Sequence, residues 1–131
     1  MTLYKITTKI VIEFHDLLGP DLEAQGIRDR GNLDYLVERI NEKEDVFWRA
    51  AWAFYLADQH PFWDGQKRTA FYLADMILRG EGYYIHEEQD KVISVLTKIA
   101  RYECTGKIGD IENWLRKKCR RHPKSEQLHL R

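Results

Sequence analysis

The stretch from Asp45 to Gln59 limits the possible folds most strongly, because it predicts a helix that is apolar on nearly every face. A helix without a polar face is stable only when other elements surround it. The stretch is too short to cross a bilayer, so we expect it at the centre of a folded core. Its aromatic side chains then serve packing, not cofactor binding. The apolar residues are Val46, Phe47, Trp48, Ala50, Ala51, Trp52, Ala53, Phe54, Tyr55, Leu56 and Ala57.

The segments around this helix repeat apolar residues at helical spacing, which predicts an all-α fold of about six helices. We expect one domain over residues 1–131, a short extended lead over residues 1–6 and a brief extended stretch at Tyr83–Ile85. Three of the other predicted helices run from Thr7 or Thr8 to Leu18, from Gly65 to Arg79 and from Glu87 to Cys104. A further helix ends at Ile40 and has Asn32 as its predicted cap, and the last helix has Asp110 as its predicted cap.

The charge balance gives no reason to expect a nucleic acid or an anionic membrane as partner. The chain has 21 basic and 21 acidic side chains, hence a formal net charge of zero. Two cysteines, Cys104 and Cys119, are too few for a disulfide framework and lack metal-ligand spacing. The first residues contain no apolar secretory core. We therefore expect a cytoplasmic protein without a membrane span.

A run of basic residues begins at Arg116 and supports two interpretations. It favours a solvated, frayed tail over residues 116–131, and contact with an acidic partner or nucleic acid is the alternative. The basic residues are Arg116, Lys117, Lys118, Arg120, Arg121 and Lys124.

The residues from His60 to Arg68 follow directly on the apolar helix and combine groups that suit phosphate chemistry. Gly65 precedes a helix whose free N–H groups and dipole attract an anion, and Lys67 and Arg68 add positive charge. Asp64 is a hard oxygen ligand for Mg²⁺, and His60 can accept a proton near neutral pH. These residues predict a site that transfers a phosphate-containing group to a hydroxyl.

The same residues resemble the motif of the Fic/Doc family, His-x-Phe-x-Asp/Asn-x-Asn-Gly/Lys-Arg. Five of its six specified positions match, namely His60, Phe62, Asp64, Lys67 and Arg68, and Gly65 occupies the unspecified position after Asp64. The order and spacing of the predicted helices match the all-helical Fic fold over nearly the whole chain. Lysine at position 67 is typical of the Doc toxin branch, whereas the branch with glycine there mostly transfers AMP.

This resemblance implies a Doc-like kinase that uses ATP and Mg²⁺ to phosphorylate a Ser or Thr hydroxyl of a target protein. It implies His60 as the base and Asp64 as the metal ligand. Gly65, Gln66 and Lys67 would cradle the transferring group, and Arg68 would stabilise its charge. Elongation factor Tu is the target known for that branch. No Ser/Thr-x-x-x-Glu-Gly/Asn inhibitory signature occurs in the chain, so a small antitoxin protein is implied as a partner.

Two alternatives stay open beside the kinase. One is AMP transfer to a protein hydroxyl by the same site. The other is a non-catalytic protein of the same fold that binds a nucleotide or a partner, because Gln66 stands where the family motif has asparagine.

Three further features receive weaker predictions. His15-Asp16 is expected to be a partly exposed pair near a helix end. Residues 19–31 are either a solvated connector or a flap that holds a target peptide, and Gly26–Asp29 resembles the Gly-x-Arg-Asp of Doc-like chains. Trp63 either contacts the substrate or shields the site.

Overall fold

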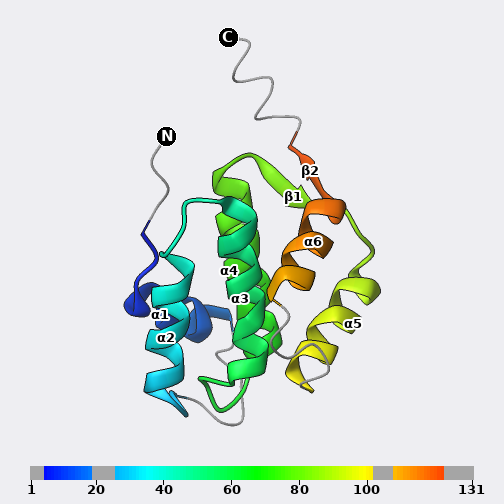
Figure 1. Cartoon of the computed structure of the whole chain (residues 1–131). Coiled ribbons are helices and arrows are strands. Elements are labelled where there is room, and N and C mark those ends of the chain that lie inside the picture. The colour runs from blue at the N-terminus through cyan, green and yellow to red at the C-terminus, as the bar shows by residue number, and fades with distance from the viewer. Residues whose placement is uncertain (1–4, 19–25, 102–107, 123–131) are drawn as a thin grey trace.

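The computed structural model describes residues 5–18, 26–101 and 108–122, and this part of the chain forms six helices and two short strands (Figure 1). The all-α fold predicted from the sequence is therefore confirmed. The elements are α1 (Thr8–Leu18), α2 (Arg30–Ile40), α3 (Val46–Gln59), α4 (Gln66–Gly80), β1 (Tyr83–Ile85), α5 (Gln89–Ala100), α6 (Ile108–Lys118) and β2 (Cys119–Arg121).

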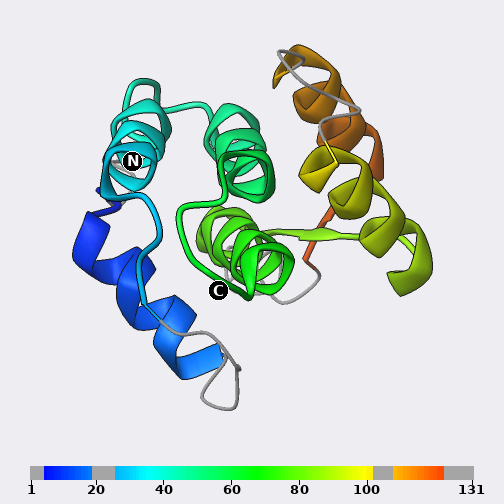
Figure 2. The same cartoon turned by 90° about the horizontal axis from the view of Figure 1, so that it is seen from below.

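Helices α3 and α4 form the centre of the molecule and pack against each other along their lengths. Figure 2 shows α1 and α2 on one side of this pair and α5 and α6 on the other. Both central helices carry alanines without solvent exposure, which let two backbones approach closely: Ala50, Ala51, Ala53, Ala57, Ala70 and Ala74. The expectation that the apolar stretch after Asp45 lies in the core is confirmed.

Three helices begin at polar caps, and the sequence predicted two of these starts correctly. The Oγ1 of Thr7 accepts a hydrogen bond from Ile10 N at 3.1 Å, and Asp45 accepts from two amides at the start of α3. Asn32 was expected to cap α2, but this prediction is wrong. Asp29 is the cap, and its side chain accepts from Asn32 N at 2.9 Å.

The last helix also begins earlier than predicted. Asp110 was expected to be its cap, but it lies inside the first turn of α6, which starts at Ile108. A carboxylate in the first turn still suits the positive end of the helix dipole. The preceding helix is shorter than predicted at its start, because Glu87 pairs with Lys118 and the amide of His86 donates to the Lys118 carbonyl. Its predicted residues 102–104 lie outside the described part of the chain.

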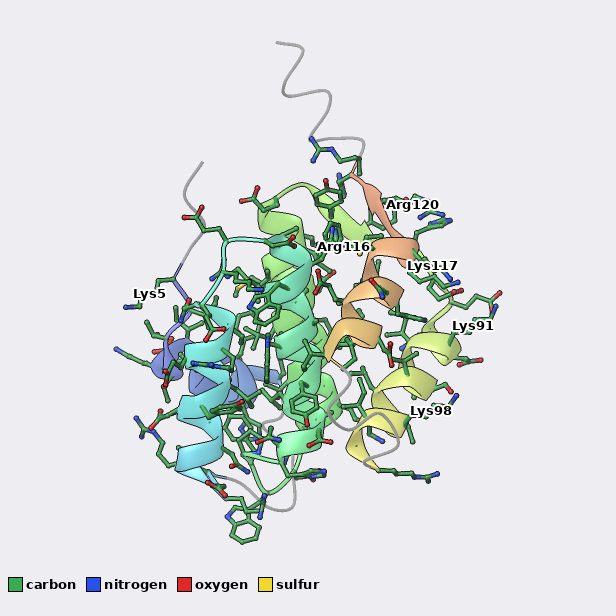
Figure 3. All side chains as sticks on the ribbon, viewed as in Figure 1. Lys5, Lys91, Lys98, Arg116, Lys117 and Arg120 are labelled. Carbon is green, nitrogen blue, oxygen red and sulfur yellow. The ribbon has the colours of Figure 1, made fainter. Side chains whose placement is uncertain are left out.

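The basic run from Arg116 is ordered as far as Arg121, so the predicted frayed tail is wrong for these residues. Arg116 to Lys118 form the last turn of α6, and Cys119–Arg121 pair as β2 with β1 in antiparallel register. Figure 3 shows Lys117 and Arg120 on the same side of the molecule as Lys91 and Lys98 of α5. Residues 123–131, with Lys124, lie outside the described part.

The described helices include none that is long and apolar enough to cross a membrane. The thiol of Cys119 is buried between the strand and the core, and this burial raises its pKa to about 11. Cys104 lies outside the described residues.

Asp45 joins the start of α3 to α6, and it provides a test of the fold. Its carboxylate accepts from Phe47 N and Trp48 N and receives Arg116 Nη2 at 2.6 Å. Partial burial opposes ionisation, but the hydrogen bonds from Arg116 and the two amides outweigh it and lower the pKa of Asp45 below 3.8. Its charge therefore stabilises the fold above the unfolded-state pKa, and this contribution is lost as the pH falls through the folded-state value.

We predict that Asp45→Ala lowers the free energy of unfolding by about 1–2 kcal/mol at pH 7, because the helix loses its cap. Asp45→Asn keeps an acceptor for the cap and loses only the charge, so it should cost less. Urea denaturation measured from pH 7 down to pH 3 should show the difference between wild type and Asp45→Asn shrinking in acid. A difference that is independent of pH would contradict the role of the carboxylate charge.

Candidate functional site

The turn between α3 and α4 reverses the chain at one end of the central helix pair, the end toward the viewer in Figure 2. His60 ends α3 with φ 47° and ψ 54°, and its amide donates to Leu56 O at 3.1 Å. Among the described residues it alone has a positive φ without being glycine. Pro61 explains why the helix stops here, because a residue before proline is disfavoured in the helical conformation. Such backbone outliers persist where surrounding contacts fix them, often at functional sites.

The backbone of Gly26–Asp29 pairs with this turn. The amides of Arg28 and Asp29 donate to Pro61 O at 2.7 and 3.0 Å, and Trp63 N donates to Gly26 O at 3.3 Å. Ile27 and Phe62 form an antiparallel bridge between the two segments. The described part of the loop is thus bonded to the turn and is not simply a solvated connector. Its predicted function as a peptide-holding flap remains a prediction, and residues 19–25 lie outside the described part.

Two side chains from this region satisfy the last carbonyls of α3. Arg28 Nε donates to His60 O at 2.7 Å, and Asn32 Nδ2 donates to Gln59 O at 2.7 Å. The final carbonyls of a helix lack partners within the helix, so these bonds fix the position from which the imidazole of His60 projects. Sequence reasoning assigned no such role to Arg28 or Asn32.

Phe62 and Gln66 close the turn from inside. Phe62 is almost fully buried, as expected for the anchor of this loop. The side-chain amide of Gln66, which is 8% exposed, pairs with both backbone groups of Phe62: its Oε1 accepts from Phe62 N at 3.3 Å, and its Nε2 donates to Phe62 O. The side-chain amide of Gln66 therefore holds the loop. The backbone N–H of Gln66, and not its side chain, is then the donor at the first turn of α4.

His15 of α1 also contacts the turn from inside, and the prediction of a partly exposed pair is wrong for this residue. It is 2% exposed and stacks on Phe62, with ring centroids 3.8 Å apart and an angle of 7° between the planes. Its Nε2 donates to the backbone oxygen of Asp64 at 2.7 Å, while Nδ1 lies 3.2 Å from Asp16 Oδ1. The neighbouring Asp16 is exposed, as expected.

The start of α4 brings together the predicted anion-binding groups. Gly65 is its N-cap with φ 79° and makes no side-chain cap, and its amide donates to Asp64 Oδ1 at 2.8 Å. The first hydrogen bond along the helix runs from Thr69 N to Gly65 O, so the amides of residues 66–68 have no partner within the helix. Lys67 and Arg68 are exposed there, and Arg68 Nη1 donates to Leu18 O at 2.5 Å.

A cavity of about 990 Å³ adjoins this turn between α4 and α5. All six predicted site residues line it: His60, Asp64, Gly65, Gln66, Lys67 and Arg68. Trp63, whose role the sequence left open, is 59% exposed and also lines the cavity. The wall away from the turn is largely apolar and includes Phe71, Tyr72, Ile85, Val92, Ile93 and Leu96.

The imidazole of His60 is held by the C-terminus of α5. Its Nε2 lies 3.1 Å from Ala100 O. A carbonyl oxygen only accepts, so Nε2 carries the hydrogen in this contact and the neutral ring has its lone pair on Nδ1. No sequence pattern indicates this contact, because a backbone group makes it.

The site fits a magnesium–nucleotide complex better than a metal held by protein alone. The described residues contain no cluster of three or more His, Cys, Asp or Glu side chains that could hold a metal ion. Mg²⁺ is commonly bound by one or two carboxylates together with substrate phosphates. Asp64 is an exposed carboxylate in the cavity, next to the first turn of α4 and its two cations. Glu87, also in the cavity wall, is paired with Lys118, whose hydrogen bond lowers the pKa of Glu87.

The two hydrogen bonds between the side-chain amide of Gln66 and the backbone of Phe62 give a prediction about the turn. Gln66→Ala leaves two buried backbone groups without partners, so it should lower the free energy of unfolding by about 1–3 kcal/mol. The neighbouring Lys67→Ala removes an exposed cation and should change that energy by less than about 0.5 kcal/mol. Urea denaturation of both variants measures this. Equal, small effects would show that the amide of Gln66 does not hold the turn.

Comparison with known proteins agrees with the motif. No curated protein matches this sequence. The sequence model of the Fic/DOC family matches residues 5–78, from the start of α1 into the last turns of α4, which is more than half of the chain. The chain therefore belongs to the Fic/DOC family, whose members are typically transferases.

Proposed function

We propose that this protein is a Doc-like kinase, which transfers the terminal phosphate of ATP to a Ser or Thr hydroxyl of a target protein. The observation that carries this proposal is the single cavity lined by His60, Asp64, Lys67, Arg68 and the first turn of α4. A base, a hard oxygen ligand, two cations and free helix amides are the groups that phosphoryl transfer needs, since it depends mainly on positioning and charge neutralisation.

His60 is the base in this proposal. In the tautomer that donates to Ala100 O, Nδ1 has the lone pair and takes the proton of the target hydroxyl. The hydroxyl oxygen forms a bond to the terminal phosphorus, the bond from that phosphorus to the oxygen bridging to the next phosphate breaks, and ADP leaves.

The first turn of α4 is the anion site. Cations there oppose the helix dipole by roughly 0.3–1 kcal/mol each, so two in succession are better explained by a bound anion than by helix stability. Lys67 contributes a point charge. Arg68 has five N–H donors, and its bond to Leu18 O orients the guanidinium without using all of them. Asp64 would hold Mg²⁺, which neutralises phosphate charge when bound.

Lys67 favours phosphate transfer over AMP transfer. It is the second residue of α4. The family resemblance implies that a glycine at this position leaves room for the phosphate nearest the nucleoside. It also implies that a lysine crowds that space, and that the nucleotide of the Doc branch binds in the reverse direction and presents its terminal phosphate. AMP transfer is therefore the second candidate, and the two reactions leave different groups on the target.

Labelled ATP distinguishes phosphate transfer from AMP transfer. We expect γ-labelled ATP with Mg²⁺ to label a protein in a cell extract, and α-labelled ATP to label none. Purified elongation factor Tu, which the family resemblance implies as a target, provides a defined substrate. His60→Ala should lower the rate by at least about 100-fold, because a positioned base contributes that much or more. His122→Ala, after β2 at the far end of the molecule, is the matched control.

Transfer of the α label alone would contradict the kinase and support AMP transfer. Transfer of neither label, by a protein that still binds nucleotide, would support the non-catalytic alternative. In that case Gln66→Asn, which restores the family residue, should produce activity if the longer amide is the obstacle.

Lys67→Gly tests the proposed role of the lysine. It removes a charged donor worth about 1.5–3 kcal/mol, so transfer of the γ label should fall about 10–100-fold, and transfer of the α label should appear. Lys67→Arg keeps the charge and bulk and should retain γ transfer alone. Unchanged γ transfer by Lys67→Gly would show that this lysine does not select the reaction.

A further inference from the structure

We infer that His15 is a positioning residue of the site, which sets the orientation of the peptide group between Asp64 and Gly65. This inference deepens the proposed function. The expected effect of His15 on catalysis rests on that function, whereas the orientation of the peptide group does not. His15 lies on α1, 49 residues before Asp64, and is nearly as buried as any apolar residue of the core. A buried imidazole on a helix face that otherwise packs apolar side chains calls for a specific role.

The geometry shows what His15 fixes. Its Nε2 donates to Asp64 O at 2.7 Å, so this carbonyl points inward toward α1. The described residues contain no cis peptide, and in a trans peptide the N–H points opposite to the C=O. The Gly65 N–H therefore points away from α1, toward the Asp64 carboxylate, which accepts it at 2.8 Å. One hydrogen bond thus orients both the metal-seeking carboxylate and the entry to α4.

Gly65 makes this hydrogen bond necessary. Turning the peptide between residues 64 and 65 by half a turn changes φ of Gly65 from 79° to a negative value, and glycine tolerates both. The backbone alone consequently does not select one orientation. The donor on His15 selects the orientation with positive φ, in which the Asp64 side chain lies in the cavity wall.

The ring of His15 is fixed in turn by its neighbours. It stacks on Phe62 at 3.8 Å between centroids, and Phe62 is the residue that Gln66 binds on both backbone groups. His15, Phe62 and Gln66 therefore form one buried unit behind the turn. Removal of the ring and removal of the N–H donor have separable effects.

Two substitutions separate these contributions. His15→Phe keeps an aromatic ring over Phe62 and removes the donor. His15→Gln loses the ring but carries an amide nitrogen the same number of bonds from Cα as Nε2, so it can donate to Asp64 O. Val11→Ala, on the buried face of the same helix, is the control for a loss of stability that leaves the turn untouched.

The first readout needs no catalysis. The chain has eight glycines, and ¹⁵N-glycine labelling gives one amide signal for each, with Gly65→Ala identifying that of Gly65. We expect the Gly65 signal to move in His15→Phe, and to stay near its wild-type position in His15→Gln and Val11→Ala. An unmoved signal in His15→Phe would overturn the inference. If His15→Phe does not fold, a displaced signal in His15→Gln overturns it.

The second readout is the reaction. His15→Phe should lower the rate of γ-label transfer at saturating ATP by about 10–100-fold and raise the Mg²⁺ concentration for half-maximal rate, as for groups that orient metal ligands. His15→Gln should recover most of this loss. An equal loss in Val11→Ala at matched stability would reduce His15 to a structural residue and overturn its positioning role. A wild type that transfers neither label would end the proposed function alone, because the Gly65 signal still decides the orientation of the peptide.

Discussion

The packing of α3 against α4 determines where the chain reverses, and hence where the site lies. Both helices carry alanines with no solvent exposure, so their backbones approach closely, and the chain must reverse within the few residues between Gln59 and Gln66. Because these two helices are the centre of the core, their junction has a fixed position. A short turn on two buried helices is a rigid support for chemistry, which loops elsewhere on the surface seldom provide.

Segments distant in sequence complete the turn. His15 from α1 binds the Asp64 carbonyl, Arg28 binds the His60 carbonyl, and the Ala100 carbonyl at the end of α5 binds the imidazole of His60. The positive φ of His60 and that of Gly65 lie on either side of the turn and are held by these contacts. The geometry of the site consequently depends on the correct packing of several helices, and a local change in any of these helices alters the cavity.

Two opposite helix ends give the site its electrostatic character. The N-terminus of α4 presents amides and positive potential to the cavity, and the C-terminus of α5 presents a carbonyl oxygen to the imidazole of His60. The proposed base and the proposed anion site therefore lie in one cavity. The buried polar side chains near the turn are ones that bind backbone groups, such as Gln66 and His15.

Much of this arrangement could be predicted from the sequence, because helical periodicity and the residues from His60 to Arg68 are local signals. The helix start at Asp45 was predictable for the same reason. Asp29 and Asn32 are both good cap residues, and the structure has Asp29 accepting from Asn32 N while the Asn32 side chain binds Gln59 O. The burial of His15 had a signal in the sequence, since His15 follows the buried Val11 by four residues on the same helix. Its contact with Asp64 had none, because the partner is a backbone oxygen. Contacts made by backbone groups, such as Ala100 O, leave no pattern in the sequence.

A crystal structure of the protein with Mg²⁺ and a non-hydrolysable ATP analogue tests the proposed site directly. We expect phosphate oxygens within hydrogen-bond distance of the amides at residues 66–68, with the metal on Asp64 and His60 facing the terminal phosphate. A nucleotide bound elsewhere, or phosphates that make no contact with the first turn of α4, would contradict it.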